Sequence, residues 1–415
     1  MSGSDDTRGV SDRVAVLRNG TYRLLFFATL GSGVGTWMAT IALAADVEAR
    51  TDSTWWVSGL FVVTFLPSIV VGITAGPLVD RMSRKLLIVS SDVARLAVFA
   101  ALPFVNSTAG ILALAAVAGF ANGFFRPAVL AGVPNLVAER DLAVATSLLQ
   151  ATDWLAAALG PILGGAIVSA AGADIVYWIN AATFLFSALL LVRIPARLLQ
   201  SEQGITRGHW HDLREGVALF RHSHALRAVL FGFGFAMLAG GLINASEIFL
   251  AKRALDSGAF GYGLLWSGTG VGLVTGSVLA GVLLEDRDAL EGYALVFIPW
   301  AIGIFAAAVS PSIWVAALAM VLAGLGNGLT FPMTVVVVQR ATSDRVRGRA
   351  FAVIISVHNA LFALAMVAAA ELTAAAGARW TYVIASGLIG CGACTAWAFA
   401  RGADPHPSRP GEQAV

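Results

Sequence analysis

Long stretches without any charged side chain constrain this chain more than any other feature of its sequence. A helix needs about 20 mostly apolar residues to cross a hydrocarbon core of about 30 Å. Runs of that length or more lack Asp, Glu, Lys and Arg at 24–45, 53–79, 96–125, 154–173, 257–284, 292–339, 350–370 and 380–400. A soluble domain could not bury so much apolar surface, so these runs predict membrane-spanning segments.

The predicted fold class is an all-α polytopic membrane protein with twelve spans. Apolar residues make up 58% of the 415 residues and charged residues only 13%. Asn106 and Ser107 break one long run, and 310–312 break another. Ten-residue alternating segments of the kind found in membrane barrels are absent from the sequence, which favours helices. The spans are predicted at 22–46, 55–79, 86–105, 108–131, 142–170, 175–193, 226–251, 259–284, 291–309, 312–338, 350–373 and 380–400.

The distribution of basic residues predicts which way the chain faces. If residue 1 is cytoplasmic, 21 of the 27 Lys and Arg residues lie on that side, four lie outside and two lie within spans. The positive-inside rule favours this orientation, with both termini in the cytoplasm. Residues 1–20 carry several charges and no apolar core, so we expect no cleavable signal peptide.

An internal repeat with an offset of 205 residues predicts two similar halves. The offset aligns Gly119, Asn122, Gly123 and Pro127 with Gly324, Asn327, Gly328 and Pro332. Six spans separate the members of each pair, so the halves should run parallel around one central path. We therefore expect a cytoplasmic segment at 1–21, a six-helix bundle at 22–193, a cytoplasmic linker at 194–225, a second bundle at 226–400 and a cytoplasmic tail at 401–415.

The segment after the second span carries a recognisable set of residues: Gly76, Asp80, Arg81, Arg84 and Lys85. This spacing resembles the signature of the major facilitator superfamily between its second and third helices, although Ser83 stands where a glycine is usual. The resemblance implies a transporter of two six-helix bundles in which this loop latches the halves in one access state. Glycine would allow close helix approach, and the cations would meet helix carbonyl ends.

The fifth span contains closely spaced small residues: Gly160, Pro161, Gly164 and Gly165. They resemble the glycine-proline motif of exporters in the same superfamily, and 124–128 and 346–351 resemble its drug:proton antiporter branch, which includes macrolide-efflux and enterobactin-exporter proteins. The resemblance implies proton-coupled efflux of amphipathic small molecules, such as drugs, across a bacterial inner membrane by alternating access. A packing role for these glycines stays open, because similarly spaced glycines occur in other spans.

Ionisable residues inside predicted spans are costly in lipid and are candidates for proton coupling or substrate binding. Asp153 lies mid-span, and Arg126 could pair with it as a purely structural alternative. Asp46 and Glu247 lie near the outer ends of the first and seventh spans, where helix-end solvation is the alternative. His358 could line the path or be a hydrogen-bonded core histidine. Asp92 and Arg95, one turn apart, are expected to satisfy each other.

A second group of residues would suit an apolar, aromatic pocket, although the aromatic ones could equally be packing or interface residues and hydrogen bonding across helices is favoured for the two asparagines. The group contains Trp37, Phe61, Asn122, Trp266 and Asn327. The expected partners are a small amphipathic substrate, protons and the bilayer, without nucleic acid, and we expect a monomer.

Other functional classes fit the sequence less well. The phosphate-binding GxxxxGK[ST] pattern is absent, as are HExxH and GxSxG, so we expect neither an ATP-driven pump nor an enzyme, and we expect no cofactor or bound metal. The open alternatives are an uptake transporter, or a lipid or siderophore exporter, of the same fold. A membrane-embedded enzyme is a more remote one.

Overall fold

The computed structural model describes residues 15–74, 82–199, 219–220, 223–283, 289–342 and 344–401, which form helices and no strands. Short pieces flank the long helices: α10 (His224–Arg227), α13 (Ala289–Leu295) and π-helical turns at Ala228–Gly232 and Leu250–Ala254. The long helices are α2 (Gly20–Thr51), α3 (Thr54–Thr74), α5 (Arg84–Ala101), α6 (Thr108–Gly132), α7 (Leu142–Ala171), α8 (Ala173–Val192), α11 (Phe233–Phe249), α12 (Gly258–Leu283), α14 (Phe297–Val309), α15 (Ile313–Ala341) and α16 (Asp344–Arg401).

The number of spans agrees with the sequence prediction. Within the described ranges, eleven continuous helical stretches are long and apolar enough to cross a membrane. The last of these, Arg349–Arg401, contains a non-helical residue, Gly377, with φ 80° and ψ 163°. Gly377 divides α16 into two arms, so the described ranges contain twelve candidate spans. The predicted all-α polytopic fold is confirmed.

Side-chain caps explain where two of the long runs divide. Ser107 precedes α6, and its hydroxyl accepts a hydrogen bond from the Gly110 amide at 3.2 Å. Ser312 precedes α15 and accepts from the Val315 amide at 3.4 Å. Each serine satisfies an amide that has no partner within the first helical turn. The polar breaks in the sequence are therefore helix starts.

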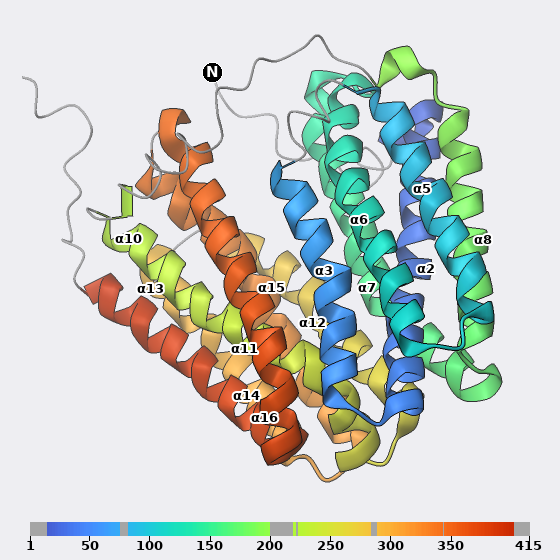
Figure 1. The fold of residues 1–415 in the computed structure, drawn as a ribbon. Coiled ribbons are helices and arrows are strands. Elements are labelled where there is room, and N and C mark those ends of the chain that lie inside the picture. The colour runs from blue at the N-terminus through green and yellow to red at the C-terminus, as the bar shows by residue number, and fades with distance from the viewer. Residues whose placement is uncertain are drawn as a thin grey trace, which may run out of the picture.

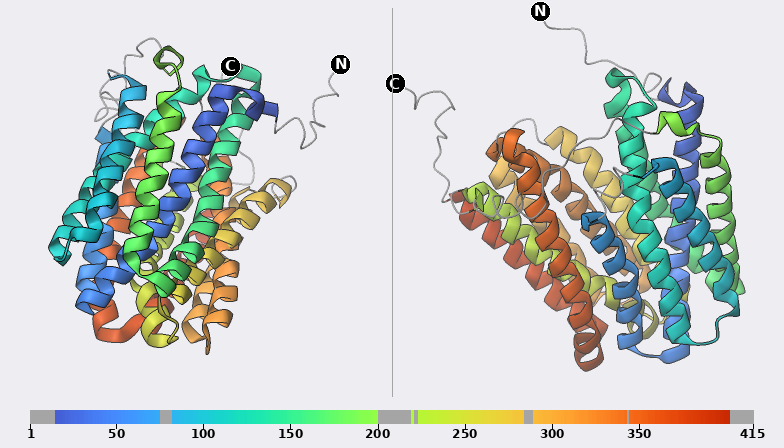
Figure 2. Two further views of the ribbon diagram at one scale, coloured as in Figure 1. Left: turned by 90° about the vertical axis from the view of Figure 1, so that its right-hand side faces the viewer. Right: turned by 45° about the horizontal axis from the view of Figure 1, so that its top comes forward.

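The helices form two adjacent bundles (Figures 1 and 2). Helices α2, α3 and α5 to α8 pack on one another and are called the first half here. Helices α10 to α16 do the same and are called the second half. Between the halves, α7 packs along α12 and α3 packs along α16. The right-hand view of Figure 2 shows the two bundles side by side.

The repeated glycines occupy equivalent contacts in the two halves. A Cβ atom on Gly119 of α6 would lie 2.1 Å from the Thr64 carbonyl oxygen of α3. A Cβ atom on Gly324 of α15 would lie 2.2 Å from the Thr269 carbonyl oxygen of α12. Only glycine allows backbones to approach so closely. The repeat therefore encodes the same helix contact twice.

Two further glycines follow the same repeat and form one-residue connections between helices. Gly172 joins α7 to α8 with φ 85° and ψ 172°, and Gly377 joins the two arms of α16 with φ 80° and ψ 163°. Their positions differ by 205 residues. This backbone region is essentially restricted to glycine. In each half, a single glycine therefore connects the last two helices.

Candidate functional site

A cavity of about 280 Å³ lies among the helices of the first half, between α2, α3 and α5 to α8. Aromatic side chains supply much of its wall: Trp37, Phe65, Phe99, Phe125 and Phe184. The strongly polar members of the lining are Arg95, Asn122, Arg126, Gln150 and Asp153. The lining therefore combines apolar rings with a few charged and amide groups, as small-molecule sites commonly do.

The structure brings Arg126 of α6 and Asp153 of α7 together on the cavity wall. Arg126 Nη1 lies 2.5 Å from Asp153 Oδ2, and Arg126 Nη2 donates to Gln150 Oε1 at 3.2 Å. The Arg126 side chain is 51% exposed and that of Asp153 is 29% exposed. Arg126 and Asp153 lie at different depths in their spans, and the long arginine side chain bridges that difference. The pair is accessible to a molecule in the cavity.

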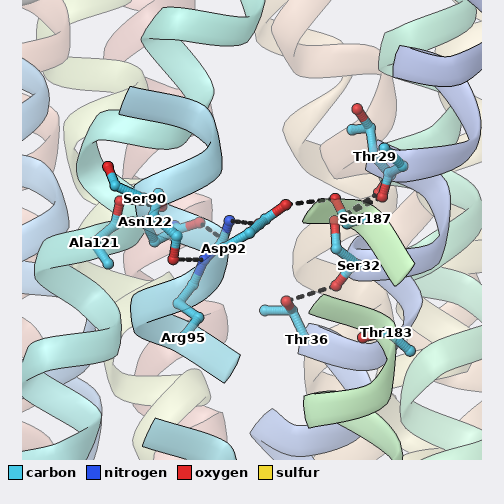
Figure 3. Close-up of polar contacts among 12 residues, drawn as sticks. Thr29, Ser32, Thr36, Ser90, Asp92, Arg95, Ala121, Asn122, Thr183 and Ser187 are labelled. Atoms are coloured by element: carbon cyan, nitrogen blue, oxygen red, sulfur yellow. Dashed lines mark hydrogen bonds and ion pairs between the residues drawn. The ribbon is translucent and has the colours of Figure 1, made fainter. Parts of the chain in front are cut away.

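A second charged pair is fully buried beside the cavity (Figure 3). Asp92 Oδ1 lies 2.6 Å from Arg95 Nη2, as the spacing of one turn on α5 predicts. Ser187 of α8 donates to Asp92 Oδ2 at 2.6 Å. Asp92 is 0% exposed and Arg95 is 4% exposed. Hydrogen bonds to both carboxylate oxygens compensate for the burial of the charge.

Arg95 also forms part of the cavity wall, which the sequence prediction did not anticipate. Its guanidinium lies 4.4 Å from the ring centroids of both Phe125 and Phe184. Its Nη1 donates to Asn122 Oδ1 at 3.3 Å, and Asn122 Nδ2 donates to Ser68 Oγ at 3.4 Å. These contacts join four helices. The repeat-related Asn122 is thus tied to a buried cation as well as lining the cavity.

At the end of the molecule where α2 meets α3, called the Asp52 end here, ion pairs join the two halves. Glu48 of α2 pairs with Lys252, which follows α11. Asp52 accepts from Arg253 at 2.5 Å through its carboxylate and at 2.9 Å through its carbonyl oxygen. Glu48 is only 7% exposed. Glu48 is not among the residues predicted from the sequence, although Glu48 and Lys252 are 204 residues apart, close to the repeat offset.

Asp46, the candidate one turn from Arg50, also lies at the Asp52 end but within the first half. Its Oδ1 pairs with Arg50 Nε at 2.7 Å, and its Oδ2 accepts from the Tyr177 hydroxyl at 3.0 Å. Arg50 further donates to the carbonyl oxygens of Val105 and Asn106. Asp46 therefore has both a cation and a hydroxyl as partners.

Two other ionisable candidates lie in the second half. Glu247 of α11 is 3% exposed, and no described side chain or backbone group forms a hydrogen bond or ion pair with its carboxylate. His358 of α16 is buried, its Nε2 lies 3.1 Å from the Leu230 carbonyl oxygen, and its ring packs edge-on against Phe233. His358 thus has the contacts of a hydrogen-bonded core residue, whereas Glu247 lacks a partner.

The glycine-proline segment of α7 packs against both halves. Gly160 and Gly164 face α2, where a Cβ atom on Gly164 would lie 2.6 Å from the Met38 carbonyl oxygen. Gly165 faces α12, and its Cβ would lie 2.5 Å from the Ala259 carbonyl oxygen. Next to Pro161, the Ile162 amide donates to Ser267 Oγ of α12 at 3.0 Å. The segment therefore allows close contact between the halves.

The loop that resembles the superfamily signature lies partly outside the described residues, and this applies to Gly76, Asp80 and Arg81. Arg84 donates to the Ala131 carbonyl oxygen at the end of α6, and Lys85 donates to the Val192 carbonyl oxygen at the end of α8. The cations thus meet helix carbonyl ends, as expected. Ser83, the departure from the usual glycine, caps α5 through a bond from the Leu86 amide.

The remaining pocket candidates are distributed between the halves. Phe61 is 2% exposed and stacks on Phe65 of the cavity wall. The Trp266 ring lies 5.0 Å from the Trp37 ring, so it contacts the cavity lining from the second half. Asn327 is partly buried in α15 and does not line this cavity. The structure therefore groups Trp37 and Asn122 with the cavity and leaves Asn327 outside it.

Comparison with known families and sequences adds a functional context to this geometry. A family profile described as "transmembrane secretion effector" matches residues 11–401. An uncharacterised MFS-type transporter, YfiS of Bacillus subtilis, is 27% identical over 179 residues. The enterobactin exporter EntS of Citrobacter koseri is 29% identical over 280 residues. The matches cover 43% and 64%, respectively, of both this chain and the relative.

Solved structures share the fold at low sequence identity. A bacterial homologue of the iron transporter ferroportin superposes with a TM-score of 0.71 at 13% identity, covering 92% of this chain and 99% of that one. A bacterial homologue of the lysosomal transporter Spinster superposes with a TM-score of 0.71 at 14% identity, covering 92% and 97%. These matches establish the arrangement of the helices.

Proposed function

Because the chain belongs to the transmembrane secretion effector family of the major facilitator superfamily, and is a membrane transporter and not an enzyme, we propose that it exports amphipathic small molecules in exchange for protons. The observation that carries this proposal is the lining of the cavity in the first half. Aromatic rings of Trp37, Phe65 and Phe99 offer apolar contact, while the exposed Arg126 and Asp153 pair offers charge. An amphipathic molecule needs both kinds of contact.

The charge distribution supports an orientation for this transport. With both termini in the cytoplasm, as the basic residues favour, the Asp52 end faces outward. The Glu48–Lys252 and Asp52–Arg253 pairs would then hold the outer ends of the halves together. Alternating access requires that these pairs break when the path opens outward. Arg84 and Lys85 belong to the proposed latch at the opposite end.

A transport assay with a matched pair of variants tests this function. Purified protein in liposomes with an imposed pH gradient should move ethidium, an amphipathic aromatic cation, against its gradient. Asp153→Asn leaves Arg126 without its counter-charge and should weaken apparent ethidium affinity about fivefold, the equivalent of about 1 kcal/mol for a partly exposed pair. Asp174→Asn removes an exposed carboxylate of α8 outside the cavity and should match the wild type.

The outcomes separate the candidate functions. Absence of gradient-driven movement for ethidium and other amphipathic probes would refute proton-coupled export. Equal affinities of the Asp153→Asn and Asp174→Asn variants would remove Asp153 from the substrate site. Accumulation of the probe in the same direction as the proton flow would indicate an uptake transporter.

Export of a siderophore is the second candidate, because relatives in several bacteria are named enterobactin exporters. Enterobactin added to the same liposomes should then inhibit ethidium movement competitively. Inhibition that is lost in Trp37→Ala would assign the aromatic wall to this ligand. Movement of labelled lipid, without movement of ethidium or enterobactin, would favour a lipid exporter.

A further inference from the structure

Glu247 has an environment that an ionised carboxylate cannot occupy without compensation. It is 3% exposed, and one of its oxygens is completely buried without a hydrogen bond from any described group. Burying an unpaired charge costs several kcal/mol, and a carboxylate avoids that cost by binding a proton or another cation. An ionised Glu247 in this environment would therefore need a proton or another cation to neutralise it.

Other buried polar groups without hydrogen-bond partners lie on α11 itself and on α12 and α16. Tyr262 of α12 and Tyr382 of α16 are 0% exposed, their hydroxyls have no hydrogen-bond partner, and the charge of Glu247 would act on both. Asn244 Oδ1, one turn from Glu247 on α11, is also buried without a partner. The Trp266 indole N–H, one turn from Tyr262, lies near that hydroxyl but outside hydrogen-bond geometry. These five residues are called the Glu247 cluster here.

The neighbouring cations are already engaged elsewhere. Lys252 and Arg253, which follow α11, pair with Glu48 and Asp52 of the first half. Arg379 of α16 donates to the carbonyl oxygens of Ala308, Ser310 and Ala254. These three cations therefore do not neutralise Glu247, and within the described part of the chain no lysine or arginine forms an ion pair with it. The facing ionisable groups on α12 and α16 are the two tyrosines.

The internal repeat provides a built-in comparison. Tyr177 and Tyr382 are 205 residues apart, and each lies close to a carboxylate of its own half. In the first half the carboxylate is Asp46, which is neutralised by Arg50. The position equivalent to Arg50 in the second half is Leu255. The second half therefore keeps a tyrosine and a carboxylate together but lacks the cation.

An aromatic pair connects the Glu247 cluster with the cavity wall. Trp266 of the cluster and Trp37 of the cavity wall have ring centroids 5.0 Å apart with an interplanar angle of 51°. The pair bridges α12 and α2, which belong to different halves. A molecule that displaces Trp37 would therefore act directly on the packing of Trp266 and the cluster.

We infer that Glu247 carries the exchanged proton, in a site of the second half that is separate from the substrate cavity of the first half. This inference rests on the proposed proton-coupled export. In the state described here, the proton neutralises the buried carboxylate. It leaves toward the cytoplasmic side when substrate in the cavity displaces Trp37 and hydrates the cluster. Glu247 is reprotonated from the outer side when the path opens outward, so that proton and substrate cross the membrane in opposite directions. Trp37 and Trp266 couple substrate occupancy in one half to proton binding in the other.

Infrared difference spectroscopy on the purified protein tests the proton site without any substrate. The wild type at neutral pH should show a carbonyl band of a protonated carboxylic acid that shifts in D₂O. Glu247→Gln should remove this band, whereas Glu371→Gln, which changes an exposed carboxylate of α16, should retain it. A band that persists in Glu247→Gln would overturn the inference. A band that is lost on adding NaCl would also overturn it, because sodium would then be the ligand.

Transport in liposomes tests whether the second half binds the proton and the first half binds the substrate. Glu247→Gln should abolish ethidium-driven proton release, followed with a pH-sensitive dye, and should retain ethidium binding measured by tryptophan quenching. Asp153→Asn should instead weaken ethidium binding and retain a proton release per ethidium like that of the wild type. Reversed results for the two variants would refute the assignment. Ethidium movement that never requires a pH gradient in the wild type would refute the proposed function itself, independently of the infrared result.

Discussion

Gly263 of α12 offers a direct test of how closely the two halves pack. A Cβ atom there would lie 2.2 Å from the Pro161 carbonyl oxygen of α7, whereas ordinary contact begins at 3.4 Å. Gly263→Ala must therefore separate the two backbones by about 1 Å, because neither contacting group is a flexible side chain. Overpacking of this kind costs about 1–3 kcal/mol. We expect a loss of stability of that size.

The control is a glycine with open space around it. A Cβ atom on Gly387 of α16 would meet no atom within 4 Å. Gly387→Ala should leave the free energy of unfolding within about 0.5 kcal/mol of the wild type, or raise it slightly through helix propensity.

Unfolding by SDS in mixed micelles, followed by tryptophan fluorescence, measures the free energy of unfolding for both variants. The expected result is a destabilised Gly263→Ala beside an unchanged Gly387→Ala. Equal stability of the two variants would refute the close approach of α7 and α12. If the overpacking by Gly263→Ala destabilises only one access state by about 1–3 kcal/mol, the equilibrium constant between the two access states would change about 5- to 150-fold.

Two further predictions concern charged groups in the helices. Asp92→Asn leaves Arg95 buried without its counter-charge and should lower the free energy of unfolding by about 3–5 kcal/mol in the same SDS titration, and an unchanged midpoint would contradict the buried pair. Lys252→Glu places like charges beside Glu48 and should separate the Asp52 end of the halves, seen as longer distances between spin labels on α2 and α11. The added change Glu48→Lys should restore the short distances, and failure to do so would argue against the pair.

The span count and the repeat were predictable from the sequence because they depend on local patterns. Uncharged runs mark helices wherever they pack, and Ser107 and Ser312 mark helix starts through contacts within one turn. The offset of 205 residues found Gly119 and Gly324, whose small size is needed wherever two backbones touch. Arg126 and Asp153 could also be predicted as candidate site residues from the sequence, because a charged residue within an apolar span is easily recognised.

Other parts of the candidate site depend on contacts between distant segments. Nothing in the local sequence distinguishes Glu48 from a solvated residue at a helix end, because its partner Lys252 is 204 residues away. Tyr262 and Tyr382 carry no charge, so nothing in their local sequence distinguishes them from packing residues. Arg95 was recognised as a partner of Asp92, but its exposure to the cavity follows from how α5, α6 and α8 pack.

The connections at Gly172 and Gly377 have a consequence for how the chain enters the membrane. A single residue cannot form a polar loop that would wait outside while the next helix is inserted separately. We therefore expect helices α7 and α8, and likewise the two arms of α16, to enter the bilayer together as hairpins. Any side chain with a Cβ atom is strained at these two positions. We expect substitution of either glycine to reduce the membrane insertion of the final helical pair of its half. This defect would arise during biosynthesis and would not depend on any substrate.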